Sequence, residues 1–157
     1  MSTQPPRGLQ VAALSLCIAG LLVSAYLTYE HFTASTTLAC PDTGAINCAK
    51  VTTSDYSNVA GIPVALLGLL FFAGMTLLCT PPLWHQHSPW PGRARLAAVT
   101  VGLLFVFYLV WAELFRINAI CLWCTVVHAL TLLLFAVLAV VQALAPTAVD
   151  ERIGAGR

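Results

Sequence analysis

Residues 117–145 read INAICLWCTVVHALTLLLFAVLAVVQALA, a run of 29 residues without an Asp, Glu, Lys or Arg. A helix needs roughly 20 apolar residues to cross the hydrocarbon core of a bilayer, so this run is long enough. The whole chain agrees, because 59% of its 157 residues are hydrophobic and only 8% are charged. Soluble domains average about 45–50% apolar and about 25% charged residues. A net charge of +1 leaves no basic surface for phosphates, which argues against a nucleic-acid partner. The sequence predicts an integral membrane protein.

Three further apolar runs precede this one. We expect one all-α membrane domain, residues 1–157, built as a four-transmembrane-helix bundle with helices at about 9–30, 61–80, 95–115 and 117–145. The connections would be an outer, extracytoplasmic loop at 31–60, a cytoplasmic loop at 81–94 and a tail at 146–157. The first run could instead be a signal peptide, but its apolar part exceeds the roughly 7–15 residues of such a segment, and no clear small-residue cleavage site follows.

The distribution of Lys and Arg predicts the orientation. If the N-terminus is cytoplasmic, the inner segments hold five basic residues, Arg7, Arg93, Arg95, Arg152 and Arg157, and the outer segments hold two, Lys50 and Arg116. Cytoplasmic segments carry the excess of basic residues, so both termini are expected on the cytoplasmic side of the cytoplasmic membrane. Four of the six cysteines then fall on the outer side, namely Cys40, Cys48, Cys121 and Cys124.

Cys121-Leu-Trp-Cys124 opens the fourth predicted helix as a C-x-x-C motif. Residues three apart lie on one helical face, so the two sulfurs can bond. The N–H groups and dipole of a helix N-terminus stabilise a thiolate, which suits a redox centre. The alternatives are an inert disulfide or half of a zinc site.

The second outer pair, Cys40 and Cys48, encloses seven residues that include Pro41 and Gly44, and this loop can close a small disulfide ring. Alone it would be as consistent with a structural staple as with redox chemistry. The two pairs together have the layout of an electron relay, with one pair open to a soluble thiol protein and the other at the membrane surface, where a quinone can reach it. The same four thiolates could instead form a closed zinc tetrahedron.

With these features the chain resembles the vitamin K epoxide reductase family over nearly its whole length. The resemblance is carried by four helices, the Cys-x7-Cys loop after the first, C-x-x-C opening the fourth, Ser54 six residues after Cys48, and Gly61-Ile62-Pro63 entering the second helix. Bacterial relatives oxidise a periplasmic thioredoxin-like protein and pass the electrons to a quinone. The chain stops at Arg157 without the fused thioredoxin-like domain of some bacterial members, so we expect a separate protein partner.

The resemblance implies a role for each site residue. Cys40 would exchange with the partner, Cys48 would shuttle to Cys121, and Cys124 would be the thiolate facing a quinone, either ubiquinone or menaquinone. Ser54 would lie near the quinone, although a turn or N-cap serine is the plain alternative. The chain would thus be a disulfide-forming membrane thiol:quinone oxidoreductase.

His128 marks a departure from the epoxide-reducing members, which carry a Tyr at this position. Those members also use an Asn near the second helix, where only Asn58 could be a counterpart, so both positions argue against epoxide reduction. His128 follows Cys124 by four residues and shares its helical face, about 6 Å deeper. A histidine inside a span is a functional candidate, here as a donor to a quinone carbonyl, and its alternative is an interhelical hydrogen bond.

The remaining polar residues and cysteines have plainer interpretations. Cys17 and Cys79 are expected to be small core residues. Glu113 and Arg116 are three apart at a helix end and are expected to pair with each other. His85 and His87 supply two metal ligands without a third, and therefore predict a solvated loop.

Two functions from other classes compete with the redox interpretation. In the first, the chain is a non-enzymatic membrane scaffold or transporter subunit whose disulfides are structural. In the second, it is a metal-handling membrane protein that uses the four outer cysteines as ligands. The first predicts disulfides that do not exchange, and the second predicts metal bound after purification.

Overall fold

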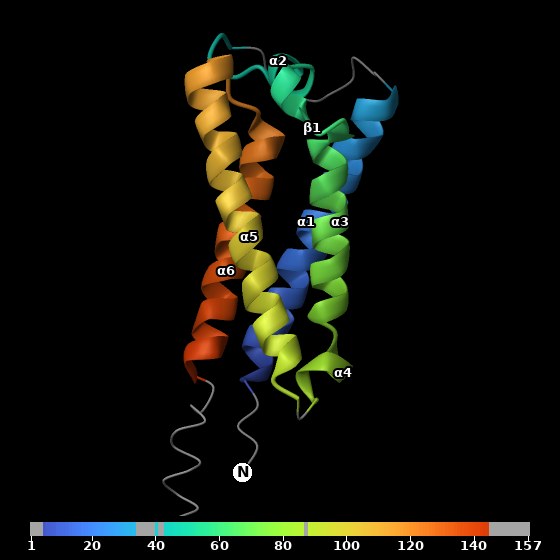
Figure 1. Cartoon of the computed structure of the whole chain (residues 1–157), viewed down its shortest axis with the longest axis vertical. Helices are drawn as coiled ribbons and strands as arrows, with labels where there is room; N and C mark the ends of the chain where they lie inside the picture. Colours follow the sequence, from blue (N-terminus) through green and yellow to red (C-terminus); the bar gives the residue numbers. More distant parts are fainter. Residues whose placement is uncertain (1–4, 34–39, 41–42, 87, 145–157) are drawn as a thin grey trace, which may run out of the picture.

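The computed structural model describes residues 5–33, 40, 43–86 and 88–144. Four long helices run alongside one another (Figure 1): α1 (Arg7–Thr33), α3 (Val64–Leu78), α5 (Trp90–Ala112) and α6 (Leu122–Leu144). Helix α1 packs against α3 and α6, and α5 packs against α6 and α3. The expectation of a mainly helical protein is therefore confirmed.

Three of these helices are long and apolar enough to cross a membrane, namely α1, α6 and the segment Trp90–Ile117, which joins α5 to a π-helical turn, η2 (Glu113–Ile117). This agrees with the expectation of a membrane protein. Helix α3 is apolar but has 15 residues, a length of about 22 Å at 1.5 Å per residue.

The helix ends differ from those expected, for local reasons. Helix α3 begins at Val64 instead of 61, because Ala60 and Gly61 adopt positive φ in the turn of a two-stranded hairpin, β1 (Asn58–Val59) and β2 (Ile62–Pro63). Helix α6 begins at Leu122 instead of 117, because η2 continues the preceding helix and Asn118 then breaks it with a left-handed backbone. The expected loop 81–94 contains a short helix, α4 (Pro81–Trp84), and the first turn of α5. The expected tail 146–157 lies outside the described residues.

A stripe of small residues explains how closely α1 and α3 approach. Ala13, Cys17, Gly20 and Ser24 are buried along one face of α1, with the three-and-four spacing that keeps residues on one side of a helix. A Cβ atom on Gly20 would overlap the ring of Phe72 from α3. Below this contact the core continues with Met75, Val99, Leu134 and Leu138.

Residues 43–63 cover one end of the helices (Figure 1) and hold α2 (Cys48–Thr52) and a 3-10 turn, η1 (Asp55–Ser57). A parallel bridge between Ile46 and Ile120 fastens it to the residues that precede α6. The N–H of Asn47 donates to the Ile120 carbonyl at 3.1 Å, and the N–H of Ile120 donates to the Ala45 carbonyl at 2.9 Å. This bridge brings the Cys40–Cys48 pair close to Cys121 and Cys124.

Candidate active site

Cys40, Cys48, Cys121 and Cys124 meet in one buried cluster at the end of the helices. Cys48 and Cys121 are buried together with Val51, Ile117 and Ala119, and Cys40 and Cys124 pack against them. Cys40 and Cys48 form a disulfide, whereas Cys121 and Cys124 are free thiols. Two cysteine pairs that are distant in the sequence, one oxidised and one reduced, are thus neighbours.

The two thiols of the C-x-x-C motif have different surroundings. Cys121 is fully buried directly before α6, and its sulfur accepts a hydrogen bond from the Cys124 N–H at 3.3 Å. The hydrogen bond from the Cys124 side chain, followed by those from the N–H groups of Cys124 and Trp123, lowers the pKa of Cys121, although burial and the Glu113 charge act in the opposite direction. Cys124 lines a cavity that Cys121 does not reach.

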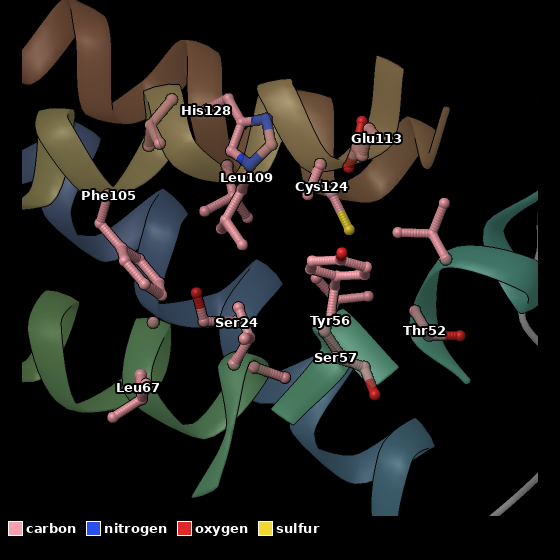
Figure 2. Close-up of a pocket in the computed structure, with 18 of the residues that line it drawn as sticks. Ser24, Thr52, Tyr56, Ser57, Leu67, Phe105, Leu109, Glu113, Cys124 and His128 are labelled. Carbon is pink, nitrogen blue, oxygen red and sulfur yellow. The ribbon is translucent and has the colours of Figure 1, made fainter. Parts of the chain in front are cut away.

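This cavity lies between the helices and has a volume of about 330 Å³. Most of its wall is apolar, with side chains from all four long helices, including Leu67, Phe71, Phe72, Val101, Phe105, Leu109 and Val127. Its polar groups include Ser24, Ser54, Tyr56, Glu113, Cys124 and His128. Figure 2 shows Glu113, Cys124 and His128 on one side and Tyr56 and Ser24 opposite them, with the Cys124 sulfur directed toward Tyr56. The cavity thus combines an apolar interior with a thiol and a few polar groups.

His128 lies in this cavity, on α6 and deeper than Cys124 (Figure 2). Its side chain is 8% exposed. The imidazole has no hydrogen-bond partner within the described part of the chain, so the interhelical bond considered as its alternative role is not made there. Either ring nitrogen is therefore available to a molecule bound in the cavity.

Ser54 also lines the cavity, at the residue before η1. It does not act as a side-chain cap, because its hydroxyl donates to the Val51 carbonyl at 2.8 Å. With its proton engaged, the hydroxyl oxygen can only accept a further hydrogen bond. Asn58, the other polar residue near this turn, is exposed, donates to the Ser57 hydroxyl at 3.1 Å and does not line the cavity.

Glu113 and Tyr56 were missed by the sequence analysis as site residues. The expected pairing of Glu113 with Arg116 is wrong, because Arg116 Nε donates instead to the Tyr56 hydroxyl at 2.7 Å. Glu113 is 6% exposed, lines the cavity, and accepts a hydrogen bond from the Cys121 N–H. The wider π turn changes the direction of residues three apart, so the α-helical pairing rule does not apply here. The signal in the sequence was a carboxylate within an otherwise uncharged run.

The described residues contain no group of three or more His, Cys, Asp or Glu arranged to hold a metal ion. Of the two histidines considered as metal ligands, His87 lies outside those residues.

The sequence model of the vitamin K epoxide reductase family matches residues 11–139. The match includes the four outer cysteines, all the residues that line the cavity and most of each long helix. The chain therefore belongs to the vitamin K epoxide reductase family of quinone-linked membrane oxidoreductases.

Proposed function

We propose that this protein is a thiol:quinone oxidoreductase that supports disulfide formation outside the cytoplasmic membrane. In this proposal α3 is the fourth crossing, both termini are cytoplasmic, and residues 31–60 face the outside. Two features support the crossing by α3. It packs along α1, which is long enough to span, and the uncharged residues on both sides of it extend its apolar length from 61 to 80.

One observation carries the proposal: the C-x-x-C motif stands between the Cys40–Cys48 disulfide and the cavity. Cys121 shares a buried cluster with Cys48 of the disulfide, and Cys124, one helical turn later, lines the cavity. Electrons that arrive at Cys121 would therefore leave from Cys124.

The entry of electrons follows from the exposure of the disulfide. Cys48 is buried and Cys40 is partly exposed, so a thiolate of a separate thioredoxin-like protein would attack the Cys40 sulfur. The S–S bond to Cys48 breaks and leaves Cys48 as a thiolate next to Cys121. The partner's second thiol then releases Cys40, and the partner departs with its own disulfide.

Internal exchange completes the transfer. When Cys121 and Cys124 are joined as a disulfide, the Cys48 thiolate attacks Cys121 and Cys124 is released. Cys40 next attacks Cys48, which restores the Cys40–Cys48 disulfide and releases Cys121. The result is the combination seen in the structure, a bonded outer pair with free Cys121 and Cys124. The hydrogen bonds that lower the pKa of Cys121 make it the better leaving group in the last step.

A quinone ring fits the cavity, whose volume lies within the roughly 300–1,000 Å³ typical of small-molecule sites and whose wall is apolar with few polar groups. A bound quinone would supply a two-electron, two-proton acceptor. Cys124 would meet it as the electron donor, His128 would donate a hydrogen bond to one carbonyl oxygen, and Ser54 would orient the ring from the outer side. Glu113, which contacts the Cys121 backbone and faces the same cavity, would take up a thiol proton.

The test is quinone reduction by the purified protein in detergent, with a small dithiol as reductant and with ubiquinone and menaquinone analogues as acceptors. We expect activity in the wild type and none in Cys124→Ala. Val126→Ala is the matched control, since Val126 lies two residues along α6 and does not line the cavity. Failure of the wild type to reduce either class of quinone would contradict the proposal.

A further inference from the structure

A second pair of cysteines lies apart from the active site. Cys17 is in α1, and Cys79 directly follows α3, whose C-terminal end leads into α4 at the opposite end of the helices from α2 (Figure 1). Both thiols are buried, and they lie close enough for each to affect the ionisation of the other. They belong to the same core cluster as Met75 and Trp84. Both are core residues, as the sequence predicted, but their proximity to each other was not predicted.

A buried guanidinium accompanies the pair. Arg95 of α5 is 5% exposed, its Nε donates to the Leu78 carbonyl at 2.7 Å, and its Cζ lies 3.6 Å from the centroid of the Trp84 ring. Trp84 in turn donates from Nε1 to the Cys79 carbonyl at 2.8 Å. The Leu78 carbonyl and the Trp84 ring thus hold the Arg95 guanidinium near Cys79.

The charge of Arg95 needs an anion. Its Nη2 is buried and makes no hydrogen bond within the described residues. Among those residues, Arg95 interacts electrostatically with Cys79. A buried cation without an opposite charge is destabilising. A Cys79 thiolate offsets this cost, because it places a negative charge beside the guanidinium.

From this arrangement we infer that Cys17 and Cys79 form a second thiol–disulfide redox centre, with Cys79 as the nucleophile, Cys17 as the resolving thiol and Arg95 as the positioning cation. A Cys17–Cys79 disulfide would join α1 to the end of α3, in addition to the close contact between Gly20 and Phe72. This centre is separate from the proposed relay and does not depend on it.

The substrate class follows from burial, since only a small, uncharged two-electron oxidant can reach these sulfurs. With hydrogen peroxide, the Cys79 thiolate attacks one oxygen, an S–O bond forms, the O–O bond breaks, and the released hydroxide takes up a proton to leave as water. The Cys17 thiol then attacks the Cys79 sulfur, the S–S bond forms, and the S–O bond breaks to release a second water. Two thiols thereby lose two electrons, and one peroxide becomes two waters.

The experiment treats the reduced full-length protein in detergent with hydrogen peroxide, blocks the remaining thiols with N-ethylmaleimide under denaturing conditions, and maps disulfide-linked peptides by mass spectrometry. A variant with Cys40, Cys48, Cys121 and Cys124 all replaced by Ala isolates the inner pair. We expect a Cys17–Cys79 peptide in the wild type, and in the variant an intact mass lower by two hydrogens with no maleimide added. Cys17→Ser in that background removes the resolving thiol and should leave Cys79 as a sulfenic acid that a dimedone probe traps.

Arg95→Gln and Arg95→Lys test the role of the cation. Linkage should be about tenfold slower in Arg95→Gln, because the cation that stabilises the attacking thiolate is lost, and near the wild-type rate in Arg95→Lys. Circular dichroism reports whether each variant is folded. If peroxide leaves both thiols free in folded wild-type protein, the centre does not exist. Equal rates in folded Arg95→Gln and wild type would remove Arg95 from it, and oxidised glutathione reacting as fast as peroxide would contradict the enclosed site.

Discussion

Cys121 and Cys124 are three residues apart, yet Cys121 is buried in one cluster with Cys48 of the Cys40–Cys48 disulfide, while Cys124 lines the cavity between the helices. The segment from Asn118 to Cys121 has left the preceding helix and is fastened to the outer loop, whereas Cys124 lies in the first turn of α6. The two ends of one short motif therefore lie in two different environments, the cysteine cluster and the cavity.

Replacing Cys40 and replacing Cys124, at the two ends of the relay, should affect turnover differently. Cys124→Ala should abolish quinone reduction with any reductant, because the thiol next to the quinone is lost. Cys40→Ala should abolish turnover with a thioredoxin-like protein but retain quinone reduction driven by a small dithiol. Steady-state rates with both reductants provide the measurement. Equal loss in the two variants with the small dithiol would contradict the division.

The reactivity of Cys121 should depend on pH through its neighbour. The hydrogen bond from the Cys124 side chain is the largest of the effects that lower the pKa of Cys121 below its usual value of 9.0. Alkylation of Cys121 by iodoacetamide should therefore persist below pH 9.0 and be lost only as the pH falls through the lowered pKa. Cys124→Ser keeps a side-chain donor and should preserve this midpoint, whereas Cys124→Ala should move it to higher pH. A pH titration of alkylation, read by mass spectrometry, measures both, and identical midpoints in the two variants would exclude the side-chain hydrogen bond as the cause.

Glu113 should matter for the rate of quinone reduction more than for binding. Glu113→Gln preserves the size of the side chain but cannot accept a thiol proton, so kcat should fall by about 10²-fold, the lower end of the range for general acid–base groups, with KM for the quinone nearly unchanged. Leu114→Gln is the control, because Leu114 is exposed on the same turn. A change confined to KM would show that Glu113 shapes the cavity and does not transfer a proton.

His128 should show the opposite pattern. Its imidazole has no hydrogen-bond partner among the described residues and lies in the cavity, so His128→Leu should weaken quinone binding without removing the thiols. One hydrogen bond contributes about 0.5–1.5 kcal/mol, which corresponds to a KM raised about two- to thirteenfold. Kinetics over a range of quinone concentrations measure this effect. Unchanged KM with reduced kcat would instead place His128 in proton transfer.

Much of this fold could be predicted from uncharged runs, because a charge inside a bilayer is costly wherever it lies in the sequence. The helix ends could not be predicted in the same way. The π turn at Glu113–Ile117 and the left-handed Asn118 arise where the chain leaves one helix, pairs with the outer loop and enters the next. The predicted start of the last helix at residue 117 did not take into account that residues 118–121 pair with the loop before α3.

The candidate site shows the same limit. The four-residue spacing of Cys124 and His128 predicted that they share a face, because that relationship is local to one helix. Tyr56 was missed because its position depends on the bridge between Ile46 and Ile120 and on Arg116. Contacts between elements distant in the sequence leave no local pattern, and the pairing of Cys17 with Cys79 belongs to the same class.

The close approach of α1 and α3 should make Gly20 the residue least tolerant of added volume. Gly20→Ala places a methyl group inside the ring of Phe72, which is fully buried and cannot move without displacing the core. Overpacking of this kind costs about 1–3 kcal/mol, so the thermal midpoint in detergent should fall. Gly74→Ala is the matched control, since Gly74 also lies within a helix but has no atom within 4 Å of an added Cβ. Its midpoint should stay level or rise, because alanine is the better helix former by about 0.5–1 kcal/mol. Equal midpoints for the two variants would mean that α1 and α3 separate more easily in detergent than their packing implies.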